Sequence, residues 1–157
     1  MKEIIKGFTL IELLIVISII GILATIFLVS FTSSQRQARD VQRKSDLKQF
    51  QAALENYANA NDGLYPGMGG PSVSASTLCS TLGITCPVDP LDGTSPYGYY
   101  FQSGTGTAVC TGNCATTYTL RAELENETIM WVVCSTGESG KIISGTGFAD
   151  GFGNCPL

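Results

Sequence analysis

Apolar residues dominate a run near the amino terminus, residues 8–31, and a single charged residue, Glu12, interrupts it. The apolar residues leave no polar face, so a helix formed by this run would be apolar all round. At about 1.5 Å per residue, such a helix is long enough to cross the ~30 Å hydrocarbon core of a bilayer. The pattern therefore predicts an apolar helix over residues 8–31.

The helical pattern continues into a polar second half, residues 32–62. Larger apolar side chains recur there at helical spacing and predict a buried stripe: Val41, Leu47, Phe50, Leu54 and Tyr57. Neither proline nor glycine occurs from residue 32 to residue 61, and Gly63 followed by Pro66 supplies a stop signal. We therefore expect one long helix that ends before Gly63, with its second half packed under a globular head.

The charged residues of this second half, from Arg36 to Lys48, are mostly basic. Such a group is usually a solvated helix face with pairing four residues apart, such as Asp40 with Lys44. Contact with anionic lipid headgroups is the second interpretation. Contact with DNA is the least favoured, because no aromatic residues are interleaved with the basic ones.

The rest of the chain, residues 63–157, carries the short patterns of a small β domain. Alternating apolar positions predict a half-buried strand that contains Tyr118, Leu120, Ala122 and Leu124. Further strands are expected over residues 99–102, 128–134 and 141–143, and a short helical turn over residues 77–82. The predicted fold class is α+β, with the long N-terminal helix packed on a small antiparallel sheet of about three to four strands.

Composition excludes some chemistry. The chain has 6 cysteines, all beyond residue 78, and no histidine. The lack of histidine excludes a Cys/His zinc site and histidine-based catalysis. The sequence also has no carboxylates paired at a plausible spacing and no phosphate-binding loop, so we do not expect an enzyme.

An even number of cysteines in a small domain beyond an apolar segment is typical of disulfides formed in an oxidising compartment. Free structural thiols are the alternative. Proximity in the sequence suggests three pairs: Cys79–Cys86, Cys110–Cys114 and Cys134–Cys155. The last pair would close the glycine-rich C-terminal segment, and a loop of that size stabilises by about 3 kcal/mol in the chain-entropy model.

Glu12 is difficult to explain in an ordinary membrane anchor, because a carboxylate inside a bilayer costs about 2.5–3.5 kcal/mol on insertion scales. A cleaved secretory signal explains the run no better. Such signals have a shorter apolar region followed by a small-x-small cleavage site, which this sequence lacks.

The residues around Glu12 instead resemble the class III signal of type IV prepilins and pseudopilins: Lys6-Gly7-Phe8-Thr9-Leu10-Ile11-Glu12. The resemblance implies a type IV pilin-like fold, cleavage between Gly7 and Phe8, and N-methylation of Phe8. It also implies that Glu12 pairs with the N-terminal amine of a neighbouring subunit, which would make a buried carboxylate tolerable and set the stacking register. The chain would then comprise four parts: a leader (1–7), a transmembrane or filament-core helix (8–31), the soluble half of the helix (32–62) and the head (63–157).

Other features bear on the kind of filament. Residues 43–66 and the phrase Asp89-Pro90…Pro96-Tyr97 resemble the major pseudopilin of type II secretion. The apolar run also resembles that of a pseudopilin, because it contains no proline. A tail closed by a Cys134–Cys155 disulfide would instead resemble the tails of many type IV pilins. We expect a structural subunit of a type IV pilus-like filament. A type II secretion pseudopilin is the alternative, and a monomeric membrane-anchored extracellular binding module is more remote.

The resemblance also implies partners and a location. The partners would be further copies of the chain, a prepilin peptidase, and an inner-membrane assembly platform with its ATPase. The subunit would be a single-pass protein in inner-membrane lipid before assembly, and part of an extracellular or periplasmic filament afterwards.

Related pseudopilins hold calcium in a C-terminal loop, and Asp89, Asp92 and Asp150 are the candidate ligands here. Because the sequence lacks a dense acidic loop at that place, we favour solvated turn aspartates and predict no cofactor.

Overall fold

The structure is a computed structural model that describes residues 7–68, 73–94, 96–104, 114–125, 129–143, 155 and 157, without the side chains of residues 26–30. It divides into two compact units, Met1–Arg36 and Gln37–Leu157, and each is described by itself. Helix α1, Leu10–Ala60, contributes to both units.

In the first unit, α1 exposes its apolar side chains on all sides. Every large apolar side chain described from Phe8 to Leu23 is exposed, from 44% for Val16 to 88% for Leu10. Two polar side chains of this segment bond to the helix itself, since Ser18 Oγ donates to Leu14 O and Thr25 Oγ1 donates to Ile22 O, both at 2.7 Å. These hydroxyls therefore need no partner from outside the helix.

Within the described residues, no helix combines the length and the apolar character that crossing a bilayer requires.

The carboxyl end of α1 lies where the sequence predicts it. Ala58 O accepts hydrogen bonds from Asn61 N at 3.0 Å and from Gly63 N at 2.9 Å. Asp62 and Gly63 have φ values of 55° and 78°, the left-handed conformation that glycine adopts without steric cost. The predicted stop at Gly63 is confirmed.

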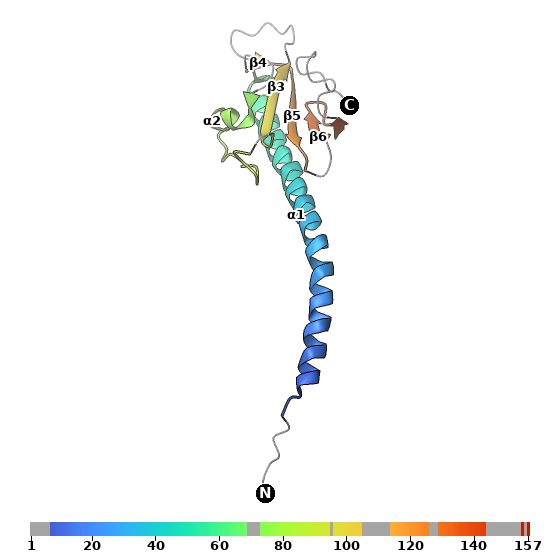
Figure 1. Ribbon diagram of the computed structural model, residues 1–157. Coiled ribbons are helices and arrows are strands. Elements are labelled where there is room, and N and C mark those ends of the chain that lie inside the picture. Colours follow the sequence, from blue (N-terminus) through green and yellow to red (C-terminus); the bar gives the residue numbers. More distant parts are fainter. Residues whose placement is uncertain are drawn as a thin grey trace. The chain divides into compact units, whose positions relative to one another are not determined.

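An antiparallel sheet in the second unit has five strands in the order β2-β3-β5-β6-β7. Figure 1 labels β3, β5 and β6 of this sheet. Its strands are β2 (Val73–Ser74), β3 (Tyr99–Gly104), β5 (Thr117–Glu123), β6 (Ile129–Cys134) and β7 (Ser139–Ile143). A separate pair joins β1 (Tyr65–Pro66) to β4 (Cys114–Ala115). The predicted helical turn is present as a 3₁₀ turn, Ala75–Leu78, followed by α2, Cys79–Leu82.

The α+β prediction is confirmed, with one more strand in the main sheet than expected. The extra strand is β2, which pairs with β3 through Val73 opposite Phe101 and Ser74 opposite Tyr100. A strand of two residues is too short to leave an alternating pattern in the sequence.

The second half of α1 forms the core together with one face of the sheet. Leu47, Phe50 and Leu54 are fully buried in one cluster whose sheet members include Phe101, Leu120 and Val133. Closer to the amino end of α1 than Leu47, Lys44 Nζ lies 4.5 Å from the centre of the Trp131 ring on β6. Helix and sheet are thus joined by a continuous layer of side chains.

The prediction that Val41 belongs to this buried stripe is wrong. Val41 is 64% exposed, whereas Arg43 is 0% exposed. The cause is helical geometry, because Arg43 is about 40° around the helix from Leu47, whereas Val41 is about 120° away. The predicted solvated basic face is also wrong in part, since Asp40, Arg43 and Asp46 are all buried.

The other face of the sheet carries a second, smaller cluster. Met130, Val132 and Cys134 of β6 pack there with Ile142 and Cys155. Gly140 of β7 also lies on this face, and a Cβ added to it would come 2.7 Å from a methyl group of Leu157. The side chain of Leu157 therefore occupies the space that the missing side chain leaves open.

Leu47→Ala tests the corrected stripe. We expect it to lower the free energy of unfolding by about 2–5 kcal/mol, because the substitution leaves a cavity in the core. Val41→Ala is the matched control and should change it by less than about 0.5 kcal/mol. Denaturant unfolding of the full chain in detergent measures both, and equal losses would contradict the assignment of Val41 to solvent.

Candidate functional site

The predicted cleavage position precedes the first turn of α1. Gly7, Phe8 and Thr9 lie outside the helix, which begins at Leu10. Phe8 is 79% exposed, and a Cβ added to Gly7 would meet no atom within 4 Å. The Gly7–Phe8 bond therefore lies in exposed, non-helical backbone.

Glu12 lies one turn further on and is bonded to Thr9. Thr9 donates to Glu12 Oε2 from its backbone nitrogen at 2.9 Å and from Oγ1 at 2.6 Å. In return, Glu12 N donates to Thr9 Oγ1 at 3.3 Å. These reciprocal bonds form a capping box, which satisfies backbone donors that a helix start otherwise leaves unpaired.

The capping box gives Glu12 a role within its own chain that we did not predict from the sequence. The signal was present as Thr-x-x-Glu directly before an apolar run. The carboxylate is already hydrogen-bonded within its own chain, so its cost in an apolar run is partly offset before any neighbour is involved.

Two predicted disulfides are confirmed. Cys79 pairs with Cys86, and Cys134 on β6 pairs with Cys155 across 21 residues of chain. Cys114 is disulfide-bonded as well, and Cys110 of the third predicted pair lies outside the described residues. The Cys134–Cys155 bond holds Cys155 in the smaller cluster, which includes Met130 and Val132 of β6.

Asp89 and Asp92, two of the candidate calcium ligands, line one small cavity of about 140 Å³. Both carboxylate oxygens of Asp89 bond to Arg43, so this side chain already neutralises a cation of the protein. Asp150 lies outside the described residues, and the described part of the chain contains no group of three or more potential metal ligands.

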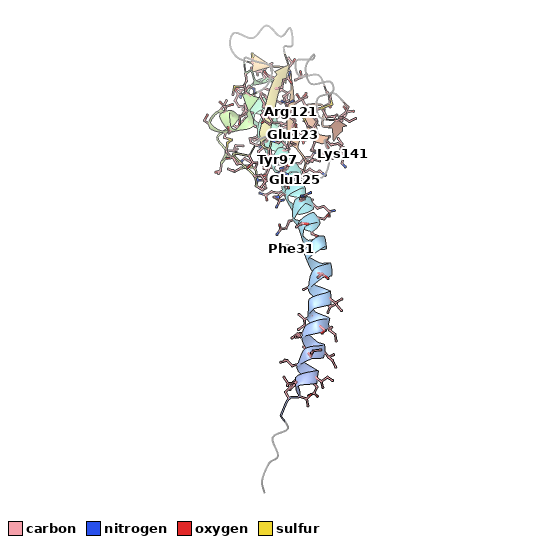
Figure 2. All side chains as sticks on the ribbon, viewed as in Figure 1. Phe31, Tyr97, Arg121, Glu123, Glu125 and Lys141 are labelled. Atoms are coloured by element: carbon pink, nitrogen blue, oxygen red, sulfur yellow. A yellow bond between two sulfur atoms is a disulfide. The ribbon has the colours of Figure 1, made fainter. Side chains whose placement is uncertain are left out.

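Arg43 is the centre of a buried ionic network at the side of α1. Its guanidinium bonds to Asp89 through Nε at 2.8 Å and Nη2 at 2.9 Å. Its Nη1 donates to Asp40 Oδ1 and to Glu125 Oε1, both at 2.9 Å. The centre of the Tyr97 ring lies 4.6 Å from the same guanidinium. Figure 2 labels Tyr97 and Glu125 in the head. Helix α1, the segment that contains Asp89 and the segment that follows β5 therefore meet at one side chain.

A second arginine completes this network. Arg39 donates to both carboxylate oxygens of Glu125 at 2.6 Å. Hydrogen bonds from Arg39 and Arg43 hold the pKa of Glu125 below its usual range, although burial acts in the opposite direction. We call Arg39, Asp40, Arg43, Asp89 and Glu125 the Arg43 cluster.

Tyrosine hydroxyls bond to two carboxylates in the interface between helix and sheet. Glu55 of α1 accepts from Tyr65 at 3.0 Å and from Tyr118 at 2.9 Å, and Asp46 accepts from Tyr99. Burial, followed by the bond to Glu55, raises the pKa of Tyr65 to about 12. These bonds satisfy polar groups that the apolar core would otherwise leave unpaired.

Thr9→Ala tests the capping box. Loss of the side-chain acceptor should destabilise the first turn of α1 by about 1 kcal/mol, and the amide of Glu12, which donates to Thr9 Oγ1, should lose protection from hydrogen exchange in detergent. Thr25→Ala is the control, because Thr25 bonds to a carbonyl within the helix. Unchanged protection at Glu12 in Thr9→Ala would show that the box contributes nothing.

The Tyr65–Glu55 bond predicts sensitivity to alkali. The folded protein raises the pKa of Tyr65 from 10.0 to about 12, so the fold favours the neutral phenol. The stabilisation is fully present below about pH 10 and is lost as the pH rises through about 12. Phenolate absorbance of the full chain should show an ionisation near pH 12 that Tyr65→Phe removes and that Tyr57→Phe, the control, retains.

Comparisons with known proteins bear on the same amino-terminal segment. The family model for the prokaryotic N-terminal methylation motif matches residues 5–28. The type IV major pilin protein PilA of Myxococcus xanthus (strain DK1622) is 40% identical over 57 residues. That match covers 36% of this chain and 26% of the relative, so it spans about a quarter of the relative's length. No solved structure matches the chain.

The two matches agree with the features that the structure places at the start of the chain, namely the exposed Gly7–Phe8 bond and the capped helix that follows it. They extend a resemblance that the sequence carries by itself in residues 6–12. Together they show that the amino-terminal part of this chain is similar to the methylation motif and to a type IV pilin.

Proposed function

We propose that the chain is a structural subunit of a type IV pilus-like filament. The observation that carries the proposal is the amino-terminal arrangement: an exposed Gly7–Phe8 bond, then the Thr9–Glu12 capping box, then an apolar helix with no covered face. A methylation motif matches this segment, and a major pilin is similar over part of the chain.

In the proposed pathway, a prepilin peptidase removes residues 1–7, and the new amino group of Phe8 is methylated. This amino group would lie one residue before Thr9, close to the carboxylate of Glu12. In a stack of subunits, Glu12 would pair with the amine of a neighbouring copy. A buried carboxylate is costly unless it is paired, so correct stacking would be favoured over incorrect stacking.

The exposed apolar side chains of α1 suit this pathway. Before assembly, residues 8–31 would hold the subunit in the inner membrane, and afterwards the same side chains would pack against other copies in the filament core. The disulfides support a head in an oxidising compartment. An assembly platform and its ATPase would be the further partners, and the chain would be a substrate of the peptidase without catalysis of its own.

A type II secretion pseudopilin is the second candidate. The phrase that resembles pseudopilins includes Asp89 and Tyr97, and both side chains contact Arg43. The C-terminal segment closed by Cys134–Cys155 and the similarity to a pilin favour the pilus. A monomeric membrane-anchored binding module would need no cleavage before Phe8, so the amino terminus of the mature protein distinguishes it from both filaments.

Mass spectrometry of the mature amino terminus, in cells that make a prepilin peptidase, tests the processing step. We expect a chain that begins at N-methylated Phe8. An intact Met1, or a cut near Ser34, would exclude the filament proposal.

Glu12 variants test the assembly step. Glu12→Ala should leave cleavage largely intact and lower incorporation into filaments. Glu12→Gln tests the role of the charge more directly, because glutamine can also form a capping box but carries no charge. Sheared filament fractions should contain about tenfold less of either variant than of the wild type. Glu138→Gln, at an exposed residue, is the control and should be incorporated normally. Normal incorporation of Glu12→Gln would refute a role for the charge.

A further inference from the structure

Three separate elements of the head meet at the Arg43 cluster. Arg39, Asp40 and Arg43 belong to α1, Asp89 to the segment between α2 and β3, and Glu125 to the segment after β5. Asp89 is 46 residues from Arg43 along the chain, and Glu125 is 82 residues away. The cluster therefore joins two distant segments to the helix.

Ion pairs join these two segments to the helix. The side chain of Arg43 is 0% exposed, and those of Asp89 and Glu125 are 1% and 6% exposed. A buried guanidinium is tolerated only while anions bond to it, and removing one partner of a buried pair leaves an uncompensated charge. Loss of the negative charge of Asp89 or Glu125 would therefore weaken the attachment of its segment to the helix.

Two backbone amides depend on the same carboxylates. Leu91 N donates to Asp89 Oδ1 at 2.8 Å, and Glu125 N donates to Asp40 Oδ1 at 2.9 Å. Protonation of these acids weakens the bonds, because a neutral carboxyl is a poorer acceptor than a carboxylate. The amides of Leu91 and Glu125 are thus natural reporters of the cluster.

The charges are not balanced, since three carboxylates surround two guanidinium groups. Neighbouring groups include the ring of Tyr97, which lies over Arg43, and the hydroxyl of Tyr99, which bonds to Asp46 on α1. Loss of the charge of any one carboxylate would leave both arginines with fewer anions around them.

We propose that the Arg43 cluster is an acid-sensitive clasp, which holds the segments around Asp89 and Glu125 on α1 near neutral pH and releases them in acid while the sheet stays folded. The sheet is held by backbone hydrogen bonds and an apolar core, and two disulfides tie further segments. None of these titrates in acid. Release would therefore change the surface of the head without unfolding it.

The direction of the effect follows from Glu125. Its pKa is lower in the folded protein than the ordinary 4.5, mainly through the hydrogen bonds from Arg39. A group with a lowered pKa stabilises the fold above its ordinary value, and the stabilisation is lost as the pH falls below that value. The clasp should therefore be closed at about pH 6, begin to lose stability below about pH 4.5 and open as the pH falls further, through the lower pKa of folded Glu125.

Hydrogen exchange of the full chain in detergent, followed by NMR and corrected for the intrinsic rate at each pH, tests the clasp. We expect the protection of the Leu91 and Glu125 amides to fall at least about tenfold between pH 6 and pH 3.5. The amides of Leu120 and Val133, within the paired strands β5 and β6, should change by less than about twofold. If all four amides lose protection together, or none does, the proposal is wrong.

Two variants separate the clasp from general acid sensitivity. Arg43→Met removes the central cation, so the carboxylates repel one another at neutral pH. The pH dependence of amide protection at Leu91 and Glu125 should then reverse, with more protection in acid than at neutral pH. Glu125→Gln keeps an acceptor for the arginines but cannot titrate, and should reduce the acid response at residue 125 even if Arg43→Met does not fold.

Lys48→Met is the matched control, because Lys48 is an exposed cation of α1 that bonds to Gln51 outside the cluster. It should retain the wild-type response to acid. A wild-type response in Glu125→Gln, or an altered one in Lys48→Met, would overturn the assignment of the effect to these side chains.

Discussion

The burial of Arg43 is the constraint on which the attachment of the head depends. A guanidinium on the buried side of a helix must find anions, and here they come from Asp89 and Glu125 as well as from Asp40 on the helix itself. The apolar stripe of α1 could pack against a sheet in several registers. The hydrogen bonds of the Arg43 guanidinium are directional, so they add a geometric specificity that apolar contacts lack.

At the amino terminus, the carboxylate of Glu12 caps the helix and, in the proposed filament, would also bind a neighbouring subunit. Within the chain, Glu12 completes the hydrogen bonds of the first turn together with Thr9. In the proposed filament it would also offset the charge of a neighbouring amine. A helix start capped in this way is formed before assembly, so subunits would meet with that turn already ordered, and less conformational entropy would be lost on docking.

Local signals in the sequence predicted much of the fold. Periodicity gave the long helix, Gly63 gave its end, alternation gave the central strands, and proximity gave Cys79–Cys86 and Cys134–Cys155. The burial of Arg43 could not be predicted, because its partners lie 46 and 82 residues away. The Thr9–Glu12 box was predictable in principle, since its signal is local.

The contact between Lys44 and Trp131 has a practical consequence. The chain contains a single tryptophan, and its indole lies on β6 beneath an ammonium group of α1, 4.5 Å from the ring centre. Indole emission responds to the polarity and charge around the ring. The protein therefore carries an intrinsic fluorophore at the junction of helix and sheet, and undocking of one from the other can be followed optically without any label.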